Sequence, residues 1–207
     1  MLVSTSFLSS KDIPKDLVLL NKTDTDYIHL DIMDGKFVTN KTMPFREMKN
    51  IYKYTHKRLD VHLMVKNPSK LIEKYATLNT EYIVIHIETT DVEANLLKIK
   101  SYGIKCGLAI KPDTKVSELL PYLPLLDIIT IMSVEPGYGG QEFLKETSSK
   151  IKELKVLLKE YKSSALIEVD GGINNKTKEY CKNADILVSG SYILNNIDYQ
   201  KAINSLR

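Results

Sequence analysis

Short runs of β-branched and other apolar residues recur along the chain, each followed by a polar turn and then by apolar residues at helical spacing. We predict a β-strand for each run. The predicted strands are Leu2–Ser6, Tyr27–Asp31, Arg58–Met64, Tyr82–His86, Lys105–Ile110, Ile128–Met132, Ala165–Asp170 and Ile186–Ser189. The helices predicted between them include Asn67–Thr77, Val92–Tyr102 and Lys145–Lys162.

Alternating strands and helices predict a parallel sheet, because a parallel connection must cross over the sheet and a helix normally supplies that crossover. Eight such units within 207 residues favour an α/β fold that closes as a (β/α)8 TIM barrel, with residues 1–207 forming a single domain. An open Rossmann-like sheet is the alternative. The first strand is not followed by a GxGxxG motif, which counts against that alternative.

The composition is that of a soluble globular protein, with 43% hydrophobic and 27% charged residues. The net charge of +3 is spread over scattered lysines and gives no support for nucleic-acid binding. The sequence has no apolar stretch approaching the ~20 residues of a membrane span and no amino-terminal signal pattern, so we expect a cytoplasmic protein. Cys106 and Cys181 are far apart and are expected to be reduced packing residues.

Polar residues close several of the apolar runs. In a barrel, reacting groups lie at the carboxyl ends of strands, where Ser6, His29, Asp31, His62 and Asp170 are found. His29 and Asp31 are two residues apart, so both project from one face of their strand. Two imidazoles and two carboxylates suit zinc, iron(II), manganese or cobalt better than calcium or magnesium.

Each of these residues taken alone is more often a hydrogen-bonded structural residue, and the case for a metal site rests on finding four together. His86 closes the fourth run and is a candidate fifth member, although a structural or substrate-lining role is favoured for it. Three methionines, Met33, Met64 and Met132, fall at or just after strand ends, where they either pack or form an apolar lining.

Glycines follow the late strands. Gly137, Gly139 and Gly140 lie after the sixth run, Gly171 and Gly172 after the seventh, and Gly190 after the eighth. Backbone N–H groups approach a phosphate closely at glycine, and barrels usually bind phosphate with the loops after strands seven and eight. A phosphorylated small-molecule substrate is therefore predicted, with ordinary turns as the alternative for each glycine group.

Six segments resemble the ribulose-phosphate 3-epimerase family over nearly the whole chain. They are HLDIMDG at 29–35, DVHLMV at 60–65, GLAIKP at 107–112, SVEPGYGGQ at 133–141, EVDGGI at 168–173 and VSGS at 188–191. Thr5 and Thr39 depart from the family pattern, because each stands where proline is usual, and the segment KTMPF at 41–45 lacks the usual glycine. We expect these changes to touch the rim of the site without removing a ligand.

The resemblance implies that one divalent ion per chain is bound by His29, Asp31, His62 and Asp170, with Asp31 and Asp170 also acting as the acid/base pair. Met33, Met64 and Met132 would line the reacting centre, and a homo-oligomer is implied. The implied substrate-binding residues are Ser6, His62, Gly137, Tyr138, Gly139, Gly140, Gly171, Gly172, Gly190 and Ser191.

The implied activity is metal-dependent interconversion of D-ribulose 5-phosphate and D-xylulose 5-phosphate, a step of the pentose phosphate pathway. It would proceed by two-base proton transfer at carbon 3 through an enediolate. Three alternatives remain at this point: an epimerase for allulose 6-phosphate, a phosphate-binding lyase or isomerase of amino-acid biosynthesis, and a non-catalytic phosphosugar-binding barrel.

Overall fold

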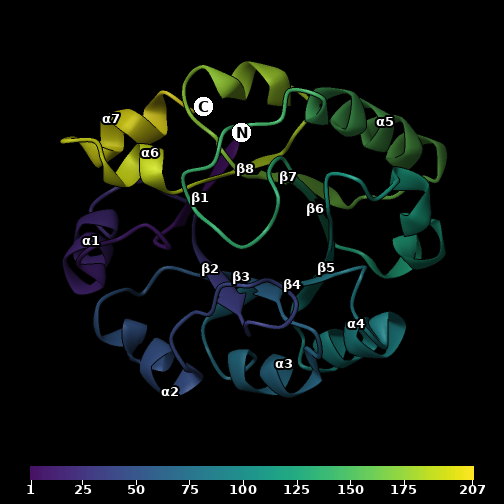
Figure 1. Ribbon diagram of the computed structural model, residues 1–207, viewed down its shortest axis with the longest axis horizontal. Helices are drawn as coiled ribbons and strands as arrows, with labels where there is room; N and C mark the ends of the chain where they lie inside the picture. Colours follow the sequence, from purple (N-terminus) through teal and green to yellow (C-terminus); the bar gives the residue numbers. More distant parts are fainter.

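The computed structural model describes residues 1–207 and shows eight parallel strands closed into a barrel in the order β1 to β8 (Figure 1). This confirms the predicted TIM barrel. The strands are β1 (Leu2–Ser6), β2 (Tyr27–Met33), β3 (Leu59–Met64), β4 (Thr80–His86), β5 (Lys105–Ile110), β6 (Ile128–Met132), β7 (Leu166–Asp170) and β8 (Ile186–Ser189). β2 runs two residues beyond the predicted end because Ile32 and Met33 pair with the end of β3.

Helices surround the barrel in a ring (Figure 1). They are α1 (Ile13–Leu20), α2 (Phe45–Met48), α3 (Ser69–Tyr75), α4 (Val92–Ser101), α5 (Thr147–Glu160), α6 (Ser191–Leu194) and α7 (Tyr199–Asn204), with 3-10 helices η1 (Lys49–Lys53), η2 (Val116–Leu125) and η3 (Thr177–Cys181). The three predicted helices are each shorter than expected. Pro68 precedes the first helical residue of α3, and α4 ends just before Gly103, whose φ of +72° favours glycine.

The η2 crossover is a 3-10 helix rather than an α-helix. It contains Pro121 and Pro124, which have no backbone N–H to donate to an α-helical hydrogen bond. A helical connection still crosses the sheet here, so the topology predicted from strand and helix alternation is kept.

The two faces of the barrel wall have different surroundings. Outward-facing residues such as Leu30, Leu63 and Ile129 join the helices in one large apolar core cluster. Toward the amino ends of the strands, the interior is filled by a second apolar cluster of Tyr82, Val84, Ala109, Ile128 and Ile186. This second cluster closes the barrel from below, as in a packed core rather than a pore.

The barrel interior turns polar toward the carboxyl ends of the strands. The polar residues that face the interior alternate along their strands with the outward-facing apolar residues, as the two-residue period of a strand requires. Those with no exposed surface include Ser4, His29, Asp60, His62, His86, Thr130 and Glu168. A buried polar layer therefore lies on the apolar cluster.

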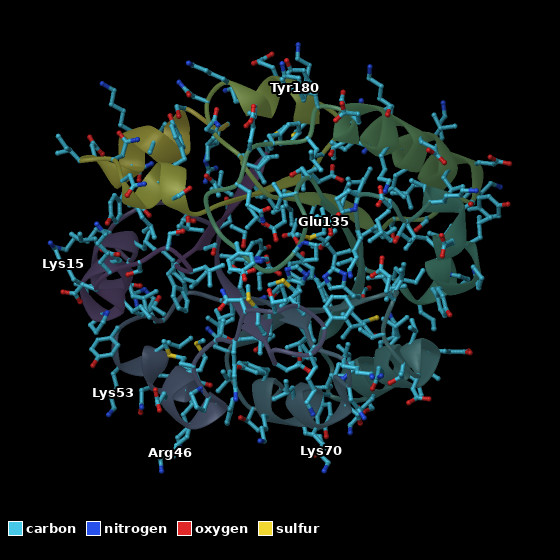
Figure 2. All side chains as sticks on the ribbon, viewed as in Figure 1. Lys15, Arg46, Lys53, Lys70, Glu135 and Tyr180 are labelled. Atoms are coloured by element: carbon cyan, nitrogen blue, oxygen red, sulfur yellow. The ribbon has the colours of Figure 1, made fainter.

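The exterior carries scattered positive charge. Lys15, Arg46, Lys53 and Lys70 project outward at separate points of the periphery, whereas Glu135 lies near the middle of the barrel in this view (Figure 2). None of the helices has the length and apolar character needed to cross a membrane.

The two cysteines provide a test of the packing. Both are fully buried free thiols, and burial raises the pKa of Cys106 to about 11 and that of Cys181 to about 12. Because the thiolate is the reactive form, the native protein should not react with a thiol reagent such as Ellman's reagent at pH 8. Two thiols should titrate per chain once guanidinium unfolds it. Rapid modification of either thiol in the folded protein would show that the packing around it is wrong.

Candidate active site

Four ionisable side chains meet at the carboxyl end of the barrel. His29 and Asp31 come from β2, His62 from β3 and Asp170 from β7, and one ligand atom from each lies within 4.8 Å of the others. His29 Nε2 is 3.5 Å from an Asp31 oxygen and 3.7 Å from an Asp170 oxygen. His62 Nδ1 is 3.7 Å and 3.3 Å from the same two oxygens. The structure thus brings together the four residues singled out as metal ligands in the sequence.

Two nitrogen atoms in this cluster lack a hydrogen-bond partner. His29 Nε2 and His62 Nδ1 are both buried and unpaired, although buried polar atoms are normally satisfied. Both face the two carboxylates, so a cation held among the four groups would give every one of these atoms a partner. Two imidazole nitrogens and two carboxylate oxygens are a donor set that suits a transition-metal ion or zinc. The cluster can therefore hold a metal ion.

Neighbouring charges shift the pKa values of His29, Asp31 and His62. Burial opposes charge on Asp31, yet His29 and His62 hold the pKa of its carboxyl well below the ordinary value. Burial lowers the pKa of His29, but Asp60 and Asp31 outweigh it and raise that pKa well above the ordinary value. Burial likewise lowers the pKa of His62, but the nearby carboxylates of Asp170 and Asp31 outweigh it and raise that pKa. Asp31 is consequently ionised, as a metal ligand or a general base must be.

His29 is oriented from behind by Asp60. The Nδ1 of His29 is 2.7 Å from Asp60 Oδ2, and the Ser4 hydroxyl donates to the same oxygen at 2.8 Å. This contact leaves Nε2 as the free nitrogen that faces the cluster, an arrangement common behind metal-bound histidines. Our sequence reasoning missed Asp60. It lies two residues before His62 and so shares its face of β3, which was the available signal.

Glu168 lies beside Asp60 in the polar layer and was also missed. One of its oxygens accepts a hydrogen bond from the Thr130 hydroxyl at 2.7 Å. Burial, together with the negative charge of Asp60, raises the pKa of Glu168 well above its ordinary value. Glu168 therefore keeps its proton, so that Asp60 alone carries the negative charge.

His86 lies behind His62 rather than in the cavity. Its Nε2 is 2.9 Å from His62 Nε2, and its Nδ1 is 3.0 Å from a Glu88 oxygen. Burial lowers the pKa of His86 to about 4, so the ring is neutral at physiological pH. Of the two roles favoured from the sequence, this position fits a structural one and not a substrate-lining one.

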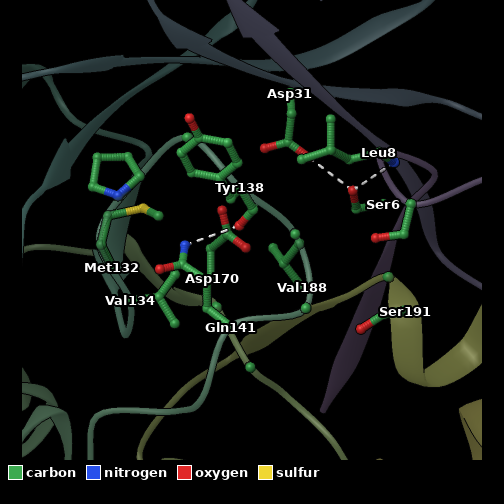
Figure 3. A pocket seen from close by; sticks show the side chains of 18 of the residues that line it. Ser6, Leu8, Asp31, Met132, Val134, Tyr138, Gln141, Asp170, Val188 and Ser191 are labelled. Atoms are coloured by element: carbon green, nitrogen blue, oxygen red, sulfur yellow. Dashed lines mark hydrogen bonds between the residues drawn. The ribbon is translucent and has the colours of Figure 1, made fainter. Parts of the chain in front are cut away.

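A cleft that is continuous with solvent opens above the four groups. Asp31 and Asp170 both face it, and the Ser6 hydroxyl donates to Asp31 Oδ2 at 2.7 Å (Figure 3). His29 and His62 lie beneath it and are fully buried. The other sequence-predicted residues that line the cleft are Met33, Met64, Met132, Gly137, Tyr138, Gly139, Gly140, Gly171, Gly172, Gly190 and Ser191.

Close packing between loops requires several of these glycines. Gly171 has a φ of +127°, and a Cβ there would lie 2.9 Å from the Val134 backbone nitrogen. A Cβ on Gly172 would lie 2.7 Å from the Phe143 nitrogen. A Cβ on Gly190 would lie 2.9 Å from the Ser6 carbonyl oxygen. These contacts hold the loop after β7 against the loop after β6 and bring the end of β8 against the end of β1 at the cleft.

The two threonines that replace proline lie in different places. The Thr39 hydroxyl is 2.8 Å from the Tyr138 hydroxyl, so it joins the loops after β2 and β6 at the rim, as expected. Thr5 does not touch the rim, contrary to expectation. It is fully buried and its hydroxyl is 2.7 Å from that of Thr25, because alternation along β1 turns it away from the barrel interior.

Enzymes with this fold carry their active sites at the carboxyl ends of the strands, where these ionisable side chains gather, and paired carboxylates are suited to proton transfer. Residues 2–194 match the model of the ribulose-phosphate 3 epimerase family. The chain belongs to that family, and it is therefore an isomerase that epimerises a carbohydrate.

Curated relatives match the chain from end to end. A ribulose-phosphate 3-epimerase of Helicobacter pylori is 38% identical, covering 100% of this chain and 97% of its own. The enzyme of that name from Synechocystis is 35% identical, covering 100% and 93%. Among solved structures, 3-hexulose-6-phosphate synthase from Salmonella typhimurium covers 100% of this chain and 96% of its own, with a TM-score of 0.70. Because that structure is only 16% identical in sequence to this chain, the match supports a shared fold and nothing more.

The proton on Glu168 predicts a pH dependence of stability in metal-free protein. Above the pKa of an unfolded glutamate, about 4.3, the unfolded chain releases this proton while the folded chain keeps it. Stability from this group therefore falls as pH rises, by at most about 1.4 kcal/mol per pH unit until the folded pKa is reached. Glu168→Gln places a neutral amide there and should remove this loss.

Urea unfolding in EDTA between pH 4.5 and 7 checks this expectation. The stability of Glu168→Gln relative to the unaltered protein should increase with pH. A difference that stays constant over this range would mean that Glu168 is ionised in the folded state.

Proposed function

We propose that residues 1–207 act as one catalytic domain that interconverts D-ribulose 5-phosphate and D-xylulose 5-phosphate. The observation that carries this proposal is the pair Asp31 and Asp170, two carboxylates that face the same cleft beside two unpaired imidazole nitrogens. Membership of the ribulose-phosphate 3-epimerase family supports the choice of substrate.

Epimerisation at carbon 3 inverts one centre without net oxidation, and two acid/base groups accomplish it. One aspartate carboxylate removes the proton from carbon 3, and the C–H electron pair moves toward the carbonyl at carbon 2 to form an enediolate. The other aspartic acid then donates a proton to the opposite face of carbon 3, so that protons and electrons balance. The ionised state of Asp31 suits the role of the base, and the Ser6 hydroxyl holds one of its oxygens.

One divalent ion per chain, zinc, iron(II), manganese or cobalt, would be held by His29 Nε2, His62 Nδ1 and one oxygen each of Asp31 and Asp170. When bound there, such an ion supplies Lewis-acid polarisation of the sugar oxygens beside carbon 3. The two histidines approach from beneath the cleft, so its upper side is left for the sugar.

The substrate phosphate would bind at the end of the cleft formed by Gly172, Gly190 and Ser191. The short helix α6 begins at Ser191 directly after β8, and barrels commonly bind phosphate with such a helix and the loops after strands seven and eight. Gly137 to Gly140 would close over the sugar, while Met33, Met64 and Met132 would exclude water from the enediolate.

We propose the cytoplasm as the compartment, because the two unpaired thiols Cys106 and Cys181 suit a reducing environment. The homo-oligomer implied by the resemblance stays a prediction.

Removal and return of metal test the proposed centre. Purified protein should carry about one divalent ion per chain, and chelation should abolish activity that zinc, manganese, cobalt or iron(II) restores. Elemental analysis combined with an epimerisation assay measures this. Full activity in protein shown to be free of metal would refute the metal-dependent mechanism.

The two-base mechanism makes a prediction for each aspartate. Asp31→Asn and Asp170→Asn should each abolish epimerisation, yet each retains one base, so each should exchange the carbon 3 hydrogen of one epimer only. Loss of one acid/base group typically slows the reaction ~10²- to 10⁴-fold, which leaves the exchange measurable. Release of deuterium from each epimer labelled at carbon 3 is the readout.

Both variants must be shown to contain metal, because loss of the ion would by itself abolish exchange at carbon 3 of both epimers. Interconversion at a near-normal rate by either metal-loaded variant would rule out this pair of residues as the two bases.

A further inference from the structure

Behind His62, the buried His86 and then the partly exposed Glu88 continue away from the cleft. His62 Nε2 is 2.9 Å from His86 Nε2, and His86 Nδ1 is 3.0 Å from Glu88 Oε2. The His62 and His86 rings stack at 5.0 Å between centroids, with 25° between their planes, and neither has exposed surface. The proton-transfer chemistry proposed above uses neither His86 nor Glu88.

The hydrogen-bond directions in this row are set from the Glu88 end. A carboxylate can only accept, so His86 must carry its proton on Nδ1 and leave Nε2 as an acceptor. His62 must then donate from Nε2–H to His86. A neutral His62 has only one ring proton, so its Nδ1 is left as a bare lone pair directed at Asp31 and Asp170. That lone pair is the unpaired nitrogen found in the cluster.

Glu88 is itself held firmly. Its other oxygen accepts hydrogen bonds from the Lys111 backbone N–H at 3.0 Å and from the Thr114 hydroxyl. The loop that carries these two donors is fastened from α5, because the Lys150 ammonium donates to the carbonyl oxygens of Lys111, Pro112 and Thr114 at 2.9, 2.6 and 2.5 Å. The Glu88 carboxylate is therefore held by the loop after β5, and α5 holds that loop in place.

The two histidines of the cluster are supported differently. His29 contacts the buried carboxylate of Asp60 directly, whereas His62 contacts a carboxylate only through the intervening His86 ring. The Phe37 ring packs against His86 at 4.7 Å between centroids and covers it from the loop after β2. A second negative charge is thus kept away from the cluster while His62 remains oriented.

We propose that His86 and Glu88 are positioning residues that fix the tautomer of His62, so that its Nδ1 is available to a divalent metal ion. The inference rests on the proposed function, because it takes His62 as a ligand. Neither residue touches the substrate, and both act through His62.

Glu88→Gln is the sharpest test, because it exchanges a single oxygen for NH2. The amide has only one oxygen, so it cannot accept from both Lys111 N–H and His86 Nδ1–H. With that oxygen on Lys111, its NH2 faces His86, which must move its proton to Nε2. His62 then accepts at Nε2 and carries its own proton on Nδ1, where the proton competes with the metal.

A matched control lies on β4, the strand that ends at His86. Glu81 is near the amino end of β4, paired with Arg58 and Lys105, and Glu81→Gln makes the same chemical change away from the site. A second test variant, His86→Phe, complements Glu88→Gln, because it keeps a stacked ring but removes the hydrogen-bond acceptor for His62. The double variant His86→Phe with Glu88→Gln tests whether Glu88 acts through His86.

Zinc affinity, measured by competition with a chelator in the absence of substrate, is the readout. Glu88→Gln and His86→Phe should each weaken zinc binding ~10- to 100-fold, the usual effect of losing a hydrogen-bond partner behind a metal ligand. Glu81→Gln should bind zinc normally, and Glu88→Gln should add no loss to His86→Phe. Nitrogen-15 NMR of metal-free protein, at a pH where His62 is neutral, should show its proton on Nε2, and on Nδ1 in Glu88→Gln.

The outcomes distinguish failure of the proposed metal centre from failure of the positioning role alone. His62→Ala should abolish tight zinc binding if the proposed centre is right, and normal binding by that variant would overturn the centre itself. If His62→Ala loses zinc while Glu88→Gln binds it normally and keeps the His62 tautomer, the positioning role is wrong. Because Glu88→Gln and Glu81→Gln alone suffice for this comparison, the test stands even if His86→Phe fails to fold.

Discussion

The structure depends on keeping ionisable side chains inside a barrel where water cannot solvate them. An unpaired charge in such a place costs several kcal/mol or changes its protonation, so each group needs a partner or a proton. Asp60 meets this requirement through Ser4 and His29, and Glu168 meets it by staying protonated. Four buried atoms have no hydrogen-bond partner: Asp60 Oδ1, Glu168 Oε2, and the two nitrogens that face the centre, His29 Nε2 and His62 Nδ1. A metal ion would satisfy the two nitrogens.

This constraint links the site to the fold beneath it. An apolar cluster lies below the polar layer and offers no hydrogen-bonding side chains except that of Tyr82, so the polar groups find most of their partners within the layer. Replacing such a layer with well-packed apolar residues is often neutral or stabilising. The polar interior is thus best explained by chemistry at the barrel mouth, with the rest of the core supplying the stability.

Loop packing then shapes the space above the cluster. Gly171 and Gly172 allow the loop after β7 to lie against the loop after β6, and Gly190 brings the end of β8 against β1. Asn40 and Thr39 connect the loop after β2 to Gly137 and Tyr138 across the mouth. The cleft is therefore enclosed by segments from distant parts of the chain, and close backbone contacts between these segments set its form.

The sequence by itself determined the strand order, the barrel and the four residues of the central cluster. Two-residue alternation and the strand-end positions of His29, Asp31, His62 and Asp170 are local properties that need no knowledge of long-range contacts. Asp60 and Glu168 each lie two residues before a member of the cluster and face the barrel interior as that member does. In the sequence alone, each looks like an isolated buried acid. Only barrel closure brings the two acids close together in the interior, where the charge of Asp60 helps to keep Glu168 protonated. The His86–Glu88 row was likewise decided by tertiary structure, because hydrogen-bond direction and tautomer depend on which atoms meet and not on spacing along the chain.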